Sequence, residues 1–269
     1  MSRSTAPPAR GVLKAPPMKG EHHRWLPSDA LSPFVEHFWF VSWDTEGKSP
    51  QSVGTLPHPS VHMVFESGVR AEIAGIYTKR FVRELRDKGQ VFGVKFKPGG
   101  FHPFYKRDLI QLRNRRIPIE SVFGVEGVEL GNQIGACGNN EARMQLAELF
   151  LTKHAPTKDE PTRLIADFFE VLTRDKSITS LNQVCSQLDI GMRQLQRLFT
   201  RYVGVTPKWV IQRYRLHEAL IHVHQDNKPD WAQLADQLGY NDQAHFIKNF
   251  KDQIGMTPEQ YWKSQDSVS

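Results

Sequence analysis

The C-terminal third of the chain repeats itself. The segment "LQRLFTRYVGVTPKWV" (195–210) is followed, at an offset of 51 residues, by "FIKNFKDQIGMTPEQY" (246–261). The offset aligns Phe199 with Phe250, Gly204 with Gly255, and Thr206-Pro207 with Thr257-Pro258. A repeat of this length indicates one supersecondary unit used twice. This part of the chain must therefore fold as two copies of one unit.

Length and composition limit the remaining possibilities. The 269 residues allow one large domain or two of ordinary size, and 39% hydrophobic with 24% charged residues is typical of a soluble globular protein. No apolar run approaches the roughly 20 residues that span a bilayer, so no membrane partner is expected. The opening "MSRSTAPPARGVLKAPPMKGEHH" lacks the apolar core of a signal peptide, and residues 1–24 and 265–269 are predicted to be flexible tails.

Cysteine use points to a reducing compartment. Cys137 and Cys185 are far apart and form no metal-type spacing. We therefore expect a cytoplasmic protein without a disulfide framework, associated with the nucleoid when bound to DNA.

The two halves of the chain differ in pattern. Residues 25–125 are predicted to form a β-rich sensor or dimerisation domain, barrel- or sandwich-like, because short apolar runs alternate with Gly and Pro. Residues 126–160 are predicted as a helical connector, and residues 161–264 as an all-α domain of seven helices. The fold class is thus α+β multidomain. Expected strands are 34–43, 60–67, 71–77 and 90–97, and expected helices are 141–155, 161–174, 180–188, 192–203, 207–224, 230–238, 243–254 and 258–264.

Charge is basic overall but unevenly placed. The net charge is +6 and the pI is about 9.3, which invites a polyanionic partner. Residues 79–116 hold twelve Lys or Arg against three acids, and residues 190–217 hold six against none. Residues 228–263 have four bases and five acids. The 79–116 region is either a solvated surface, a second DNA-facing patch or a site for an anionic effector.

The helix predicted over 192–203 has two contrasting faces. Leu195, Leu198, Phe199 and Tyr202 follow the helical i, i+3, i+4, i+7 spacing and predict a buried stripe. The opposite face carries Arg and Gln, whose side chains can contact guanine and adenine edges in the major groove. An ordinary solvated helix has the same pattern. The supporting helix in "LNQVCSQLDIG" (181–191) and the recurrence in "WAQLADQLGYNDQAHFIKNFKDQIG" (231–255) favour DNA recognition.

Residues 161–263, through "RQLQRLFTRYVGVTPKWVIQRYRLHEA" (193–219) and "LADQLGYNDQAHFIKNFKDQIGMTPEQYW" (234–262), resemble the tandem helix-turn-helix domain of the AraC/XylS family of bacterial transcription regulators. The resemblance implies a sequence-specific regulator, with activation favoured, that is not an enzyme and needs no cofactor. It implies double-stranded DNA and RNA polymerase as partners, with a small-molecule effector or a second copy as further ones. The implied DNA contacts are Arg193, Gln194, Gln196, Arg197, Thr200, Arg201, Lys208, Gln243, Ala244, His245, Ile247, Lys248 and Lys251.

Two departures from the family pattern distinguish the units. The first recognition helix lacks a Ser or Thr cap, which leaves Asp189 or Gly191 to begin it. The second has Ala244 and Ile247 where polar side chains are expected. We therefore expect the first unit to discriminate between sequences, and the second to contact phosphates and thymine methyl groups.

The N-terminal half carries a weaker resemblance. "VFGVKFKPGGFHPFYKRDLIQLRNRRIPIESVFG" (91–124), with its Phe-x-Pro-Gly-Gly segment at 96–100, is similar to a less characterised N-terminal domain of some of these regulators. By analogy an effector pocket is expected, with candidate residues His58, His62, Phe65, Phe101 and His102.

Three other functions would require different sequence features. A cupin-like metal enzyme fused to a DNA module would need acidic ligands near the histidines, and none has the required spacing. A DNA-alkylation-repair protein would need a cysteine cluster, and a nucleoid-type structural binder would not need the polar face of 193–201. The helix 141–155 could serve for dimerisation or for packing on the N-terminal domain.

Overall fold

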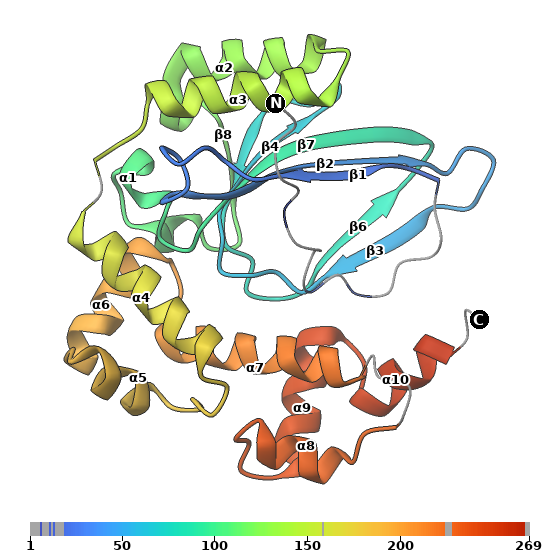
Figure 1. Cartoon of the computed structure of the whole chain (residues 1–269). Helices are drawn as coiled ribbons and strands as arrows, with labels where there is room; N and C mark the ends of the chain where they lie inside the picture. The colour runs from blue at the N-terminus through green and yellow to red at the C-terminus, as the bar shows by residue number, and fades with distance from the viewer. Residues whose placement is uncertain are drawn as a thin grey trace.

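The structure is a computed structural model that describes residues 6, 11, 13, 19–157, 159–223 and 228–266. Most of the predicted N-terminal tail and the last three residues of the C-terminal tail lie outside these ranges. The described chain forms a β-rich N-terminal part, a helical hairpin and a C-terminal helical part (Figure 1).

The N-terminal part is built on a six-stranded antiparallel sheet in the order β1-β2-β7-β4-β5-β8, with β3 and β6 paired as a separate two-stranded ribbon. Aromatic side chains line the centre of the sheet: Phe92 of β7 pairs in register with Phe40 of β2 and with Phe65 of β4. The strands are β1 (His22–Trp25), β2 (Val35–Asp44), β3 (Gln51–Thr55), β4 (His62–Glu66), β5 (Glu72–Ala74), β6 (Phe81–Leu85), β7 (Lys88–Phe96) and β8 (Arg116–Pro118).

Two helices cover one side of this sheet, α2 (Glu120–Ala136) against β4 and α3 (Asn140–Lys153) against β7. In Figure 1 they form the upper layer, while the ribbon β3–β6 and the C-terminal helices lie below the sheet. α2 is kinked at Gly124, which has a φ of 59° that glycine adopts readily. The short helix α1 (His102–Tyr105) and the 3-10 helix η1 (Leu109–Leu112) connect β7 to β8.

The seven predicted C-terminal helices are confirmed, each within two residues of its expected ends where those ends are described. They are α4 (Glu160–Arg174), α5 (Leu181–Leu188), α6 (Met192–Tyr202), α7 (Pro207–Val223), α8 (Trp231–Gln237), α9 (Gln243–Ile254) and α10 (Pro258–Asp266). The predicted end of the fourth helix at residue 224 lies outside the described residues. In Figure 1, α7 runs between the α4–α6 group and the α8–α10 group.

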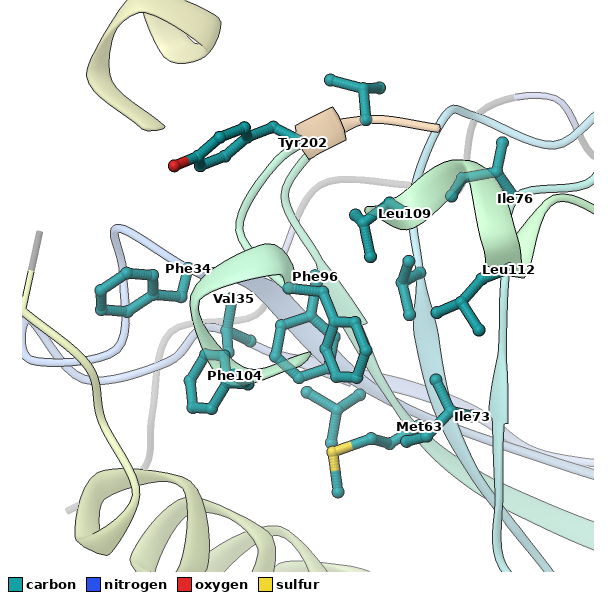
Figure 2. Close-up of a cluster of buried hydrophobic side chains, with 14 of the residues drawn as sticks. Phe34, Val35, Met63, Ile73, Ile76, Phe96, Phe104, Leu109, Leu112 and Tyr202 are labelled. Carbon is teal, nitrogen blue, oxygen red and sulfur yellow. The ribbon is translucent and has the colours of Figure 1, made fainter. Parts of the chain in front are cut away.

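Within the described ranges, three clusters of buried side chains form the core. The largest runs from the sheet through η1 into α6, so that the N-terminal part and the first repeat share one core. Figure 2 shows Tyr202 of α6 in the same cluster as Phe96, Leu109 and Phe104. A second cluster contains α7 and the second repeat, together with Leu13 and Leu56 from the N-terminal half. A small third one lies around Trp43.

Some predicted boundaries were wrong. Residues 22–24 belong to β1 rather than to a tail, because they pair with β2. The predicted boundary at 125 falls inside α2, whose glycines obscure its helical period in the sequence. The strands β1, β3, β6 and β8 were not predicted, because they are short and half exposed and carry little apolar alternation.

Candidate nucleic-acid interface

The first helical unit consists of α5 and α6 joined by a tight turn. α5 begins with a capping box in which Ser180 and Gln183 exchange hydrogen bonds with each other's backbone. It ends at Asp189, which has a φ of 48° and reverses the chain. Gly191 is the N-cap of α6 and supplies no side-chain bond, so the weak start expected from the sequence is present. The first-turn amides of α6 thus lack a side-chain acceptor.

The two faces of α6 separate as predicted. Leu195 and Phe199 are 0% exposed and Tyr202 is 7% exposed, which fixes that face in the core. Four side chains on the other face are exposed and make no hydrogen bond or ion pair within the described part of the chain: Arg193, Gln194, Gln196 and Arg197. Thr200 is also exposed, and its hydroxyl donates to the carbonyl of Gln196 at 3.0 Å. The polar face of α6 is therefore available to an external partner.

The second unit, α8 and α9, has the same plan with stronger capping. The Asp230 carboxylate caps α8, and the Asp242 carboxylate accepts the backbone N–H of His245 at 2.7 Å at the start of α9. Phe246 and Phe250 are fully buried. Of the predicted contacts on α9, Ile247 is half-buried against the second cluster. The others are exposed: Gln243, Ala244, His245, Lys248 and Lys251.

The residues that recur in the two copies have the same structural roles in both units. Gly204 and Gly255 have φ values of 82° and 91°, a region that favours glycine at the end of a helix. The Thr206 hydroxyl accepts the N–H of Trp209 at 3.2 Å, and the Thr257 hydroxyl accepts the N–H of Gln260 at 3.2 Å. The repeat therefore encodes the helix ends and the core, while the exposed faces are free to differ.

The helix α7 connects the units and is about 25 Å long at 1.5 Å per residue over its 17 residues. Its Arg213 is 1% exposed and donates to the carbonyl of Thr78 at 2.7 Å and to the Gln253 side chain at 2.8 Å. Burial lowers the pKa of Arg213 to about 10. Arg213 thus ties α7 to the end of α9 and to the N-terminal part. Lys208, in the first turn of α7, is exposed.

The N-terminal part also contacts the end of α6. The His102 ring stacks on Tyr202 with 3.6 Å between centroids, and the Tyr202 hydroxyl donates to the Asp159 carboxylate at 3.0 Å. Arg201 lies 3.6 Å from a carboxylate oxygen of Asp108, so this predicted DNA contact is engaged within the chain. The end of α9 is reached by Arg80, which donates to the carbonyl of Ile254 at 2.9 Å. The sequence held no signal for the roles of Arg80 and Arg213.

The candidate pocket residues are not brought together. His58 stacks on His217 of α7 with 4.1 Å between centroids, and His62 lies edge-on to Trp39 in the sheet. Burial lowers the pKa of His62 to about 3. Phe101 is fully buried in the main core, and His102 packs on Tyr202. Of the five, Phe65 lines the cavity between the sheet and α2. Over the described residues no group of three His, Cys, Asp or Glu side chains could hold a metal ion.

Many bases of the 79–116 region are engaged inside the N-terminal part. Lys95 is 8% exposed and donates to the Glu36 carboxylate at 2.9 Å. Burial alone would raise the pKa of Glu36, but the hydrogen bond from His37 and the charge of Lys95 hold it well below its usual value. Further ion pairs join Arg83 to Glu66, Arg86 to Glu84, Lys88 to Glu46 and Arg116 to Glu72. This region is therefore not a uniform basic surface.

None of the helices within the described ranges is both long and apolar enough to cross a membrane.

Two family models match separate parts of the chain. Residues 184–264 match a family described as "Helix-turn-helix domain", and residues 23–118 match one described as "Domain of unknown function (DUF6597)". A Haemophilus influenzae protein named "Uncharacterized HTH-type transcriptional regulator" is 26% identical over 102 residues, covering 38% of this chain and 34% of the relative. The Escherichia coli protein "Uncharacterized HTH-type transcriptional regulator YidL" is 32% identical over 135 residues, covering 45% and 44%. The chain thus spans less than half the length of these relatives.

Solved structures are similar at a lower level. ToxT from Vibrio cholerae is 12% identical, with 93% of this chain and 99% of that chain covered, at a TM-score of 0.41. An AraC-type regulator from Chromobacterium violaceum is 21% identical, with 39% and 96% covered, at a TM-score of 0.34.

The geometry of residues 160–266 and the matching family model define a tandem helix-turn-helix domain. The C-terminal domain of the chain is therefore an AraC-type helix-turn-helix domain, as the resemblance of its repeat predicted. Residues 23–118 of its N-terminal half match a different family model.

Proposed function

We propose that this protein is a sequence-specific DNA-binding regulator of transcription in which α6 and α9 enter two successive major grooves. The observation that carries the proposal is the exposed face of α6, where Arg193, Gln196 and Arg197 have no partner in the described part of the chain. Arg can bind guanine O6 and N7 with two hydrogen bonds, and Gln can bind adenine N6 and N7. Two recognition helices can reach one DNA face when their grooves are about 34 Å apart.

The two helices are proposed to have different tasks. α9 offers Lys248 and Lys251 as exposed cations but has Ala244 and a half-buried Ile247 at the positions that correspond to base contacts on α6. Its contribution would be phosphate contacts, which position the protein, and apolar contacts to thymine methyl groups. Arg201 would reach DNA only after leaving Asp108.

The wider role follows from the family. We propose that the protein acts on RNA polymerase in the cytoplasm and that the outcome at its target promoter is activation. The N-terminal half would either bind a small effector or join two copies of the chain. Its contacts to both recognition helices, through His102, Asp108 and Arg80, support a role in controlling DNA binding.

A binding selection on genomic fragments would test the proposal, followed by salt titration of the best site against random DNA. The wild-type chain should prefer one site by about a thousandfold or more. Arg197→Ala should lose about 1–3 kcal/mol on that site and little on random DNA. The matched control is Arg163→Ala, which removes one exposed Arg of α4 that is already paired with Glu160 and Asp167.

The control variant should bind both DNAs as the wild type does. Equal binding of all sequences by the wild type, or equal losses for Arg197→Ala and Arg163→Ala, would contradict base recognition by α6.

A further inference from the structure

A cavity of about 100 Å³ lies between the sheet and α2 in the N-terminal part. Its floor is aromatic, with Phe40, Phe65 and Phe92 contributed by three adjacent strands. Its roof is α2, where a Cβ at Gly131 would come within 3.0 Å of the Cβ of Ala71, so this glycine allows the helix to approach the sheet. A Cβ at Gly135 would meet nothing within 4 Å, so the cavity opens beside it.

One cation of α3 lines this cavity. Arg143 is 7% exposed, and its guanidinium lies over the Phe40 ring at 5.4 Å from the centroid. Its Nη1 donates to the Asn140 side chain at 2.6 Å and, at a longer 3.5 Å, to the Gln90 side chain. Nη2 donates to the carbonyl of Cys137 at 2.8 Å, and Nε to the carbonyl of Ile134 at 3.4 Å. These acceptors hold the guanidinium still at the end of α2.

All four acceptors are neutral, so none of them compensates the positive charge of Arg143. Across the described ranges no carboxylate forms an ion pair with Arg143, and its Nη2 group has a single acceptor for two hydrogens. The other charged side chains of the cavity are already paired: Glu66 with Arg83, and Arg70 with Glu120. A buried cation without an anion is costly, and a carboxylate that accepts the remaining Nη2 hydrogen reduces that cost.

We infer that this cavity binds a small monocarboxylate, with its carboxylate on Arg143 and its hydrocarbon part on Phe40, Phe65 and Phe92. The aromatic floor favours a carboxylate over inorganic phosphate, because one side of the ligand must be apolar. The volume sets the size: a cavity of about 150 Å³ encloses benzene, so about 100 Å³ suits a short aliphatic acid. This site differs from the pocket predicted from the histidines and shares only Phe65 with it.

Binding of the carboxylate does not depend on the proposed function. Only the role of this ligand as an effector of DNA binding rests on that proposal. The cavity is capped by α2, and α2 follows directly on β8, which is linked by η1 to the end of α6. A ligand that orders α2 against the sheet would therefore act on the same core that holds the first recognition helix.

The test is a titration of the full chain with isobutyrate, in which binding is measured from the NMR signal of the Arg143 Nε–H group. Isobutyramide, an uncharged molecule of the same shape, is titrated in the same way. Isobutyrate should shift this signal in a saturable way and bind at least tenfold more tightly than isobutyramide. Sodium chloride at equal ionic strength should leave the signal in place.

Three variants separate binding from folding. Arg143→Gln removes the charge and should weaken isobutyrate binding at least tenfold, but it also alters the end of α2. Gly135→Leu keeps Arg143 and covers the mouth of the cavity, and isobutyrate should no longer bind, as judged by the Arg143 signal. The matched control is Gly138→Leu, three residues further on, where an added Cβ also meets nothing within 4 Å but does not line the cavity. It should bind isobutyrate as the wild type does.

Equal affinity for isobutyrate and isobutyramide, the same shift with chloride, or unchanged binding by Gly135→Leu would overturn the inference. DNA selection on the same preparations keeps the two proposals apart. A chain that binds isobutyrate at Arg143 but selects no DNA site would contradict the proposed function and leave the carboxylate site standing.

Discussion

The two helix-turn-helix units are the same structure with different surfaces. Phe199 and Phe250 are both fully buried, and Gly204 and Gly255 both end a recognition helix with a positive φ. The outward side chains have diverged, with Arg193 and Arg197 on α6 against Ala244 and Lys248 on α9. The comparison teaches that the repeat preserves the residues that fold the unit, while the side chains proposed to read DNA bases lie at positions that differ between the two copies.

The units also differ in how they are embedded. The first shares its core with the sheet, whereas the second packs in a separate cluster with the C-terminal half of α7, to which the N-terminal half adds only Leu13 and Leu56 among the described residues. The N-terminal part touches the end of each recognition helix, at Tyr202 in one unit and at Ile254 in the other. The following predictions test these differences, beginning with the largest effect.

Removal of the equivalent core rings should destabilise different regions. Phe199→Ala and Phe250→Ala should each lower the free energy of unfolding by about 3–5 kcal/mol, as large cavities do. Hydrogen exchange should show that Phe250→Ala loosens α8–α10 and leaves the sheet protected. Phe199→Ala should weaken protection in the sheet as well, because its cluster is continuous with it. Equal loss of sheet protection in both variants would contradict separate cores.

The equivalent glycines should differ in tolerance. Each replacement by Ala places a side chain at a positive φ, which costs about 1–2 kcal/mol. At Gly204 the added Cβ would also lie 2.7 Å from the carbonyl oxygen of Leu109, which is backbone and cannot move aside. At Gly255 it would meet the end of the flexible Arg80 side chain at 2.5 Å. Urea unfolding should therefore rank Gly204→Ala as clearly less stable than Gly255→Ala. The reverse order would show that η1 does not press on the end of α6.

Arg80 should affect the second unit alone. Arg80→Ala removes the hydrogen bond to the Ile254 carbonyl and should cost about 0.5–1.5 kcal/mol. Amide exchange should quicken in the last turn of α9 and stay unchanged in α6. The control is Lys79→Ala, an exposed neighbour that has no bond to α9 in the described residues. If both variants behave alike, the N-terminal part does not hold α9.

Sequence patterns predicted the helical half well for identifiable reasons. The 3.6-residue period, the Asp and Ser caps and the glycines at helix ends all point to the same boundaries. The exposed face of α6 was predicted for the same reason. Arg201 was the exception, because its partner Asp108 lies in the other half of the chain.

The contacts between the halves could not be predicted from local patterns. Arg80 and Ile254 are 174 residues apart, and Thr78 and Arg213 are 135 apart. The start of α2 was missed and its bounds were not predicted, because its glycines weaken the helical signal, although Gly131 allows its close packing on Ala71. The pocket prediction grouped histidines by type, whereas the fold distributes them over three separate contacts.

The smallest expected effect concerns pH at the end of α6. Burial lowers the pKa of His102, and the charge of Arg201 acts in the same direction, against Asp159 and Asp108. In the unfolded chain His102 binds a proton near pH 6.5, whereas in the folded chain it binds one only at lower pH. The free energy of unfolding should therefore decrease as pH falls below about 6.5. Urea midpoints at about pH 7.5 and 5.5 should differ less in His102→Phe than in the wild type. His37 and His62 have lowered pKa values too, so part of the dependence should remain.

The division of tasks between the two units is tested most directly by a complete base-substitution scan of the selected DNA site. Binding is measured for the wild type, Arg197→Ala and Lys248→Ala at fixed salt. Arg197→Ala should flatten base preference in one half of the site, by about 1–3 kcal/mol at the contacted position. Lys248→Ala should weaken binding to all variants alike and reduce the salt slope by about one. A loss of base preference with Lys248→Ala equal to that with Arg197→Ala would contradict the account.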